Sequence, residues 1–420
     1  MKFSRRDFLK KSGCFIASFT TFLSLVPLAK GEGFKRGLIK IKKSPYFKPL
    51  ENKKIMCTLC PRHCVVEEGK RGYCEVRENR GGIYYSLVYG NPCAVHIDPI
   101  EKKPFFHILP SSSVFSLATA GCNFDCKFCQ NWEISQARPE ETFNYELPPE
   151  EVIKMAKEFH CSSIASTYVE PMIFYEYMYD IGRLAYKEDI LNVCHSNGYI
   201  NSKPLRALCK YLDAACIDLK AFSEKFYREV TEGSLSPVLE TLKILREEGI
   251  HTEIVNLVIP TKNDNLKMMK DMVDWIKKEL GPDVPLHFTR FYPQYKLKNL
   301  PPTPVEILEK ARELALREGL RYVYIGNVPG HSGENTHCPN CHKLIIRRLG
   351  YRIQEVNLNN GHCTYCGYPV PGIWSVKKSK REAKRLNKTN TVSVKGMPNM
   401  GSNIRLVKNA PVAEPIKSVP

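Results

Sequence analysis

Three cysteines are spaced so that a single loop would present three thiolates to a metal centre. These loop cysteines are Cys122, Cys126 and Cys129, in a C-x3-C-x2-C pattern with Phe128 just before the last of them. Three thiolates can hold three irons of a [4Fe–4S] cluster, which leaves the fourth iron open to a small molecule. A zinc site needs a fourth ligand, and no further cysteine stands beside this loop. The spacing therefore predicts an iron–sulfur centre with one open position.

A second group of cysteines lies closer to the N-terminus, within 18 residues. Four thiols at this spacing favour a closed four-ligand site over unligated cysteines. Tetrahedral zinc would stabilise a segment too short for its own core, and an auxiliary iron–sulfur cluster would use the same four ligands. The spacing leaves both metals open. This N-terminal cysteine set consists of Cys57, Cys60, Cys64 and Cys74.

A third group contains two C-x2-C pairs that are 21 residues apart. Paired C-x2-C knuckles are typical of zinc ribbons, in which each knuckle wraps its backbone around the metal. We interpret the group as a zinc site in a structural ribbon that closes one end of the larger domain. This C-terminal cysteine set consists of Cys338, Cys341, Cys363 and Cys366.

Five other cysteines lie on or beside apolar segments, and we interpret them as buried core thiols. One of them, Cys93, is also a candidate extra ligand for the N-terminal cysteine set. The five are Cys93, Cys161, Cys194, Cys209 and Cys216.

The elements that must position the loop cysteines follow them in the chain. Short apolar or β-branched stretches alternate with amphipathic ones, which indicates βα units around a parallel sheet and an α/β fold class. The expected strands are residues 114–120, 163–168, 191–195, 214–219, 253–259, 286–291 and 321–325. The expected helices are residues 149–159, 173–187, 203–212, 235–248, 263–280 and 303–318.

Polar residues stand at or just after the ends of these strands, where a barrel builds its site. Glu170 follows the second strand and Asn197 the third. Asp218 and Lys220 alternate at the end of the fourth, which puts both side chains on one face and requires a partner or a polar ligand. His287, Arg290, Asn256 and Asn327 are further candidates on or near strand ends.

The loop pattern and the strand–helix alternation resemble the radical S-adenosylmethionine (SAM) superfamily. The resemblance implies a partial (β/α)6, TIM-like barrel that carries a [4Fe–4S] cluster, with SAM bound to the open iron. It also implies reductive cleavage of SAM to a 5′-deoxyadenosyl radical, which takes a hydrogen atom from a substrate. A reductant protein, flavodoxin or ferredoxin, is the implied electron donor.

The same resemblance implies roles for individual residues in a SAM pocket. Phe128 would pack near the adenine. Glu170 would meet the amino group of SAM, although the two glycines that precede this Glu in the activating enzymes are absent here. Asn197 and His287 would line the pocket, and Asp218 and Lys220 would contact the SAM carboxylate and ribose.

Several stretches resemble one branch of the pyruvate-formate-lyase-activating-enzyme-like proteins, the radical SAM enzyme of the AmmeMemoRadiSam system. They are residues 57–61, 98–104 and 129–136, together with the C-terminal cysteine set. This branch implies Memo-like and Ammecr-like partners and leaves the substrate unidentified. One alternative is activation of a glycyl-radical protein substrate. Another is a noncatalytic iron–sulfur or zinc-ribbon interaction protein.

The formal charge of +18 is concentrated at the two ends of the 420-residue chain. Residues 44–373 hold 40 basic and 40 acidic residues, and this neutral body makes nucleic acid an unexpected partner. The composition, 43% hydrophobic and 25% charged, excludes a polytopic membrane protein and a mostly disordered chain. The expected organisation is a signal (1–30), an N-terminal Cys-rich domain (31–108), a radical SAM core (109–330), a zinc-ribbon-like element (331–374) and a basic disordered tail (375–420).

The N-terminal end resembles a twin-arginine (Tat) signal. Arg5 and Arg6 precede Phe8-Leu9-Lys10 and then a short, weakly apolar run. This pattern predicts export of the folded protein to the periplasm or to the outer face of the membrane. A cytoplasmic or membrane-anchored protein is the alternative, because SAM and low-potential reductants are cytoplasmic.

Overall fold

The computed structural model describes residues 34–376 of the chain. The expected signal at residues 1–30 lies outside this range, and so does all of the expected tail except Ser375 and Val376. Within the described residues no helix has both the length and the apolar character needed to cross a membrane. The description that follows concerns this range.

The centre of the structure is one sheet of eight strands, in the order β16-β15-β14-β13-β12-β11-β9-β8. Neighbouring strands from β9 to β16 run parallel, and β8 pairs antiparallel with β9 at one edge. The strands are β8 (Ala94–Pro99), β9 (Ser113–Ala118), β11 (Ser163–Ser166), β12 (Leu191–Ser196), β13 (Ala214–Asp218), β14 (His251–Val258), β15 (Leu286–Arg290) and β16 (Val323–Gly326).

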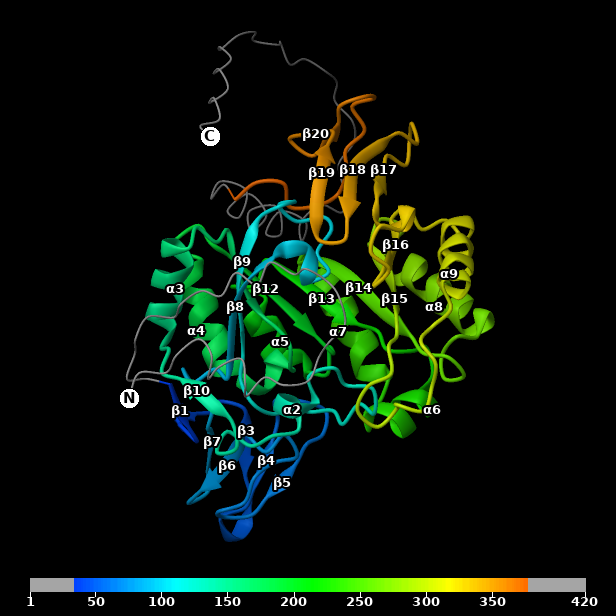
Figure 1. The fold of residues 1–420 in the computed structure, drawn as a ribbon. Coiled ribbons are helices and arrows are strands. Elements are labelled where there is room, and N and C mark those ends of the chain that lie inside the picture. The colour runs from blue at the N-terminus through cyan, green and yellow to red at the C-terminus, as the bar shows by residue number, and fades with distance from the viewer. Residues whose placement is uncertain (1–33, 377–420) are drawn as a thin grey trace, which may run out of the picture. The chain divides into compact units, whose positions relative to one another are not determined.

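Helices follow the parallel strands along the chain and flank the sheet (Figure 1). The longest of them, α8, shows why: its buried residues Met269, Met272, Val273 and Ile276 recur every three or four positions on one face. Asn265 caps it by accepting hydrogen bonds from two backbone N–H groups. The helices are α2 (Trp132–Ser135), α3 (Pro149–Glu158), α4 (Tyr175–Ala185), α5 (Ser202–Leu208), α6 (Glu224–Phe226), α7 (Ser236–Glu247), α8 (Leu266–Glu279) and α9 (Val305–Arg317).

The α/β fold class and its repeated strand–helix units are confirmed. Each expected strand overlaps one observed parallel strand, and each expected helix overlaps one observed helix. In the described sheet, β16 and β8 form the two edges, so the sheet is open, as a partial barrel requires. It has seven parallel strands, one more than the six repeats implied by the resemblance.

Small antiparallel sheets flank the main sheet on both sides (Figure 1). The N-terminal ones, blue in the figure, carry the N-terminal cysteine set, and the C-terminal ones, orange, carry the C-terminal cysteine set. The N-terminal strands are β2 (Lys42–Lys43), β3 (Phe47–Pro49), β4 (Ile55–Cys57), β5 (Val65–Val66), β6 (Arg77–Arg80) and β7 (Ile83–Ser86), and β1 (Phe34–Arg36) pairs with β10 (Phe143–Tyr145). The C-terminal strands are β17 (Thr336–His337), β18 (Leu344–Leu349), β19 (Arg352–Val356), β20 (Leu358–Asn359) and β21 (His362–Cys363).

Candidate active site

The loop cysteines follow the carboxyl end of β9 and line a single cavity of about 490 Å³. Cys126 is buried, and burial raises the pKa of its thiol to about 12, against the opposing positive charge of Lys220. Burial also raises the pKa of Cys122 and Cys129. Thiolates at such buried positions require a positive centre beside them, which the irons of a cluster would supply.

The cysteine loop is tied to the segment that follows β12. Asn123 donates a hydrogen bond from Nδ2 to the backbone oxygen of Tyr199 at 2.9 Å, and its Oδ1 accepts one from Asn197 Nδ2 at 2.8 Å. On the other side of the loop, the backbone N–H groups of Asp125 and Lys127 donate to carbonyls of the Val230–Thr231 segment. The loop is therefore fixed by contacts to distant parts of the chain.

Glu170, which follows β11, is buried, and its carboxylate accepts three hydrogen bonds, which leaves acceptor capacity on Oε2. Oε1 accepts from the Met172 backbone N–H at 3.0 Å and from Ser196 Oγ at 2.7 Å. Oε2 accepts from the backbone N–H of Asn197 at 2.7 Å. Burial raises the pKa of Glu170 to about 7, and these hydrogen bonds limit the rise. The carboxylate therefore titrates near neutral pH at the wall of the cavity.

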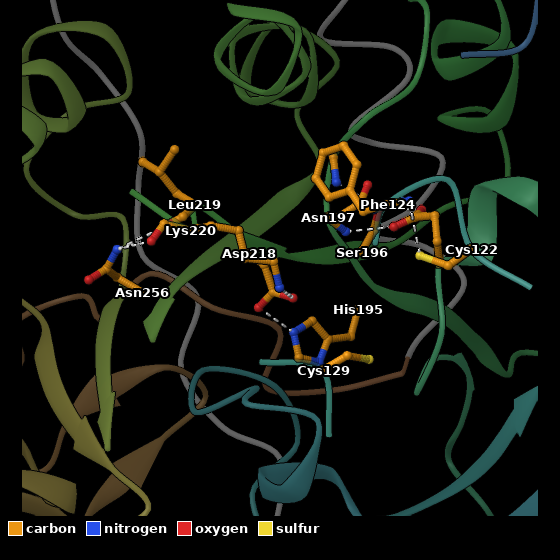
Figure 2. A network of polar contacts seen from close by, with 12 residues as sticks. Cys122, Phe124, Cys129, His195, Ser196, Asn197, Asp218, Leu219, Lys220 and Asn256 are labelled. Atoms are coloured by element: carbon orange, nitrogen blue, oxygen red, sulfur yellow. Dashed lines mark hydrogen bonds and ion pairs between the residues drawn. The ribbon is translucent and has the colours of Figure 1, made fainter. Parts of the chain in front are cut away.

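Asp218, at the end of β13, lies between two basic side chains. Its Oδ1 is 2.8 Å from His195 Nε2, and its Oδ2 is 2.7 Å from Lys220 Nζ (the His195 contact is shown in Figure 2). Burial disfavours the charged carboxylate, but the charges and hydrogen bonds of His195 and Lys220 outweigh burial and hold the pKa of Asp218 well below its usual range. The pair of strand-end charges is thus stable without a ligand and remains part of the cavity wall.

The Asp218–Lys220 segment is held in place from the next strand. Asn256 of β14 donates from Nδ2 to the backbone oxygens of Leu219, at 2.8 Å, and Lys220, at 3.2 Å (Figure 2). Asn256 does not line the cavity and acts as a support for the segment that does. Arg290 donates to the Thr303 carbonyl, also outside the cavity, whereas Asn327 is part of the cavity wall.

His287 lies in β15 and is bound to a buried carboxylate inside the sheet. Its Nε2 is 2.8 Å from Glu253 Oε2. Glu253 also accepts hydrogen bonds from the backbone N–H groups of Phe106 and His107. Burial disfavours the charged Glu253, but His251 and His287 hold its pKa well below its usual range. His287 is therefore oriented by Glu253 while its side chain lines the cavity.

A second charged group on the cavity wall was not anticipated from the sequence. Lys103 is buried with its Nζ 2.6 Å from Asp98 Oδ2, and Lys102 Nζ is 2.8 Å from Asp98 Oδ1. The hydroxyl of Tyr168 donates a hydrogen bond to the same carboxylate. Burial lowers the pKa of Lys103 to about 8, although Asp98 opposes this. Lys102, Lys103 and Tyr168 all line the cavity, so its wall carries basic and hydroxyl groups in addition to the thiols of the loop cysteines.

Glu101 adds an unpaired carboxylate oxygen to this wall. Its Oε1 accepts from the Ser111 backbone N–H at 2.8 Å, whereas Oε2 is buried and has no hydrogen-bond partner in the described part of the chain. A buried oxygen without a partner is costly, and a bound polar ligand is one way to satisfy it. The sequence signal for this group is the 98–104 stretch, in which the family resemblance identifies no site residue.

The C-terminal element also reaches the cavity. Glu334, Gly350 and Tyr351 line it, and the turn that holds the last two joins β18 to β19. The C-terminal cysteine set brings its four sulfur atoms within 4.8 Å of one another, with Cys338 Sγ 3.6 Å from Cys366 Sγ and Cys341 Sγ 3.8 Å from Cys363 Sγ. The ribbon thus combines a compact four-thiol site with a contribution to the cavity wall.

The N-terminal cysteine set is also gathered in space, with wider spacing. Electrostatic interactions link every pair of its four thiols. Across residues 34–376, only the C-terminal cysteine set brings three or more potential ligand atoms within 4.8 Å of one another. No three sulfurs of the N-terminal cysteine set are therefore within 4.8 Å of one another. Burial alone raises the pKa of Cys93, with no contribution from the set, which gives no support to Cys93 as an extra ligand.

The cavity brings together all nine residues that the sequence proposed for the cluster and SAM. Sequence reasoning missed His195, although it flanks the proposed Asn197, because nothing local pairs it with Asp218. The nine are Cys122, Cys126, Phe128, Cys129, Glu170, Asn197, Asp218, Lys220 and His287.

Residues 116–276 match the family model of the radical SAM superfamily. An uncharacterised protein of Methanocaldococcus jannaschii is 47% identical over 332 residues, which cover 79% of this chain and 99% of that protein. A solved radical SAM methyltransferase of Sphaerobacter thermophilus has a TM-score of 0.43 and 13% identity, over 54% of this chain and 71% of that one. A domain of a pyruvate-formate-lyase-activating enzyme of Bacteroides vulgatus has a TM-score of 0.35 and 14% identity, over 39% and 98%. The family match runs from β9 into α8 and includes the loop cysteines.

Proposed function

This chain belongs to the radical SAM superfamily, and on that premise we propose that it cleaves SAM reductively and removes a hydrogen atom from a substrate bound in the same cavity. The observation that carries the proposal is the shared cavity wall: the loop cysteines and the strand-end residues Glu170, Asp218 and Lys220 face one space. Membership of this enzyme superfamily argues against a noncatalytic iron–sulfur or zinc-ribbon protein.

The loop cysteines are the residues that would hold the [4Fe–4S] cluster. They are three thiols on one loop, and the cavity wall offers no fourth thiol among the described residues. This donor set fits a cluster with one open iron. When bound, the cluster supplies one electron at low potential to SAM, whose cleavage yields methionine and the 5′-deoxyadenosyl radical. Ser135 Oγ, 3.2 Å from Cys129 Sγ, is positioned to donate a hydrogen bond to one thiolate.

The strand-end residues would bind and orient SAM. Glu170 offers a carboxylate to the SAM ammonium, and Lys220 offers an ammonium to its carboxylate. Asp218 holds Lys220 at 2.7 Å and would accept from the ribose hydroxyls. Phe128 is buried and lines the cavity, with Lys220 Nζ 5.5 Å from its ring centroid, so an adenine packed near Phe128 would also lie near this cation.

Anaerobic reconstitution with iron, sulfide, SAM and a strong reductant tests this function. We expect 5′-deoxyadenosine and methionine in equal amounts by chromatography, and no product from Cys126→Ala. Cys161→Ala is the matched control, because Cys161 is a buried thiol outside the cavity. The proposal is wrong if Cys126→Ala releases as much 5′-deoxyadenosine as the unaltered protein.

The substrate side of the proposal concerns the part of the cavity wall that residues 98–104 supply. We propose an unidentified substrate that is modified together with Memo-like and Ammecr-like proteins. In support, the 98–104 stretch that carries this branch resemblance supplies Glu101, Lys102 and Lys103 to the cavity. Co-purification of such partners with the reconstituted protein tests this. If incubation instead yields a backbone glycyl radical on a partner protein, detected by electron paramagnetic resonance (EPR), the glycyl-radical alternative is correct.

We propose that the C-terminal cysteine set binds zinc. Four thiolates around Zn²⁺ with Zn–S bonds of about 2.3 Å are separated by about 3.8 Å along each tetrahedral edge. Two sulfur–sulfur distances in the set, 3.6 and 3.8 Å, agree with such a tetrahedron. A closed four-thiolate site of this kind is structural, because it leaves no position for a substrate.

We also propose export by the Tat route, which rests on Arg5 and Arg6 in the part of the sequence before the described residues. Cell fractionation of the chain with both arginines changed to lysine tests it. Unchanged localisation of that variant would contradict export by this route.

A further inference from the structure

The N-terminal cysteine set forms a four-thiol cluster that the proposed reaction does not use. Cys57 ends β4, Cys60 and Cys64 lie in the turn between β4 and β5, and Cys74 lies just before β6. The Cys57 backbone N–H donates to the Cys64 carbonyl at 2.9 Å, and the Tyr73 N–H, next to Cys74, donates to Cys64 Sγ at 3.5 Å. Electrostatic interactions between every pair of the four thiols agree with these contacts, so all four belong to one site. Cys57 is buried and the other three are partly exposed, which leaves the set close to the surface. Four thiolates are the full set of protein ligands for a zinc ion or for a [4Fe–4S] cluster.

The spacing of the sulfur atoms distinguishes between the two centres that the sequence left open. Zinc binds all four sulfurs to one atom, so they must approach within about 4 Å of one another. The four sulfurs of the C-terminal cysteine set all lie within 4.8 Å of one another, with two pairs at 3.6 and 3.8 Å, whereas among the described residues no three sulfurs of the N-terminal cysteine set lie that close. In a [4Fe–4S] cluster each thiolate binds a different iron, which sets the sulfurs farther apart.

The loop cysteines provide an internal comparison within this chain. Superfamily membership assigns them an iron–sulfur cluster, and they also interact electrostatically as pairs without meeting within 4.8 Å. The N-terminal cysteine set therefore shares the wider arrangement of the loop cysteines. It does not share the compact arrangement of the ribbon.

The two wide sites lie on segments that contact each other. A Cβ atom added to Gly121 would lie 2.6 Å from the backbone oxygen of Cys74 and 2.5 Å from a methyl group of Val76, so the residue before Cys122 touches the Cys74 segment. Arg62 donates from Nε to the backbone oxygen of Asn123 at 2.6 Å. Asn201 binds the backbone oxygens of Thr58 and Leu59. Each of the two cysteine-bearing segments is thus packed against the other.

We propose that the N-terminal cysteine set holds a second, fully ligated [4Fe–4S] cluster, which passes electrons from a protein donor to the loop cluster. In this step a low-potential one-electron donor, a reduced flavodoxin or ferredoxin, is oxidised by one electron. The second cluster is reduced and is then reoxidised as the loop cluster gains that electron; no bond forms or breaks. The relay rests on the proposed function, whereas the presence of the second cluster does not.

Metal analysis of the anaerobically reconstituted full chain tests the second cluster. We expect about eight irons and eight sulfides per chain, as two [4Fe–4S] clusters require, falling to about four of each in Cys57→Ala/Cys60→Ala. The EPR spectrum of the reduced protein should lose one of two signals in this variant. Cys93→Ala is the matched control and should keep both. About four irons in the unaltered chain, with zinc lost in Cys57→Ala/Cys60→Ala, would overturn the proposal.

Two further variants keep this test separate from that of the proposed function. Cys122→Ala/Cys126→Ala should lose the EPR signal of the loop cluster and retain that of the second cluster. If this variant keeps both signals, the result counts against a cluster on the loop cysteines and leaves the second cluster unaffected. If Cys57→Ala/Cys60→Ala misfolds, Cys57→Ser, which keeps a weaker ligand, should shift the second signal without changing the first. An unchanged pair of signals in Cys57→Ser would overturn the second cluster.

The relay is tested by the rate at which the loop cluster is reduced. A small reductant such as dithionite should reduce it in Cys57→Ala/Cys60→Ala as fast as in the unaltered chain. Reduced flavodoxin should reduce it at least tenfold more slowly in the variant, as followed by the loop-cluster EPR signal after freeze-quenching. Equal rates with flavodoxin would show that electrons reach the loop cluster by another route and would overturn the relay.

Discussion

The carboxylate of Glu170 is joined to the backbone of Asn197 by a hydrogen bond of 2.7 Å from the Asn197 N–H to Glu170 Oε2. This contact links the segments that follow two neighbouring strands, β11 and β12. Asn197 in turn binds Asn123 in the cysteine loop at 2.8 Å. A proposed SAM ligand and the cluster-bearing loop are therefore positioned by one residue, so their relative placement does not depend on a bound ligand.

The pKa of Glu170, raised to about 7 chiefly by burial, predicts a pH dependence of SAM binding. The ionised carboxylate attracts the SAM ammonium and the protonated one does not, so affinity should fall as pH drops below about 7, approaching tenfold per pH unit. Isothermal titration calorimetry between about pH 6 and 8 measures this. Glu170→Gln should bind more weakly with a flat profile, and a flat profile in the unaltered protein would contradict the assignment.

Asp218→Asn is expected to destabilise the fold, because it leaves the buried ammonium of Lys220 without its anion. Removing one member of a buried pair costs roughly 3 kcal/mol, and urea denaturation at neutral pH measures the change in the free energy of unfolding. Lys220→Met added to Asp218→Asn removes the unpaired charge and should recover much of the loss. A loss below about 1 kcal/mol in the single variant would show that the pair is effectively solvated.

Gly121→Ala is expected to separate the cysteine loop from the N-terminal segment. Gly121 has a φ of 89°, and its added Cβ would collide with the Cys74 backbone and Val76. We expect lower iron content and at least tenfold less SAM cleavage after reconstitution. Gly81→Ala is the control, since Gly81 has a φ of 64° and open space around its Cβ position. Equal losses in both variants would trace the effect to backbone strain and not to the contact.

Cys366→Ala is expected to remove zinc from the C-terminal element. This thiol is exposed, and a side-chain hydrogen bond with Asn340 contributes most to lowering its pKa to about 6, which favours the thiolate. Elemental analysis should show loss of about one zinc per chain with iron unchanged. Limited proteolysis should then cut within residues 336–363. Retention of zinc in Cys366→Ala would contradict the four-thiolate site.

Local sequence patterns were sufficient for the barrel because apolar periodicity specifies each strand and helix separately. The stretch expected as strand 191–195 is β12, Leu191–Ser196, for example. The partner of Asp218 was out of reach because it depends on register: β12 and β13 align His195 with Cys216, which brings the His195 ring within reach of Asp218. No local pattern encodes that alignment.

Residues far along the chain were missed for the same reason. Tyr351 lies on the cavity wall although it is more than two hundred residues from the cysteine loop and stands in no motif. The spacing of cysteines in the sequence also does not determine how far apart their sulfurs lie in space. Identical C-x2-C steps occur in the compact ribbon and in the wider N-terminal cysteine set.

The turn with Gly350 and Tyr351 means that two modules, the barrel and the small C-terminal element, build the wall of the cavity. The barrel carries the residues proposed for the cluster and SAM, while a separate small module contributes part of the wall around whatever else enters the cavity. A substitution at Gly350 or Tyr351 would therefore change the cavity wall without altering the strands that carry the residues proposed for the cluster and SAM.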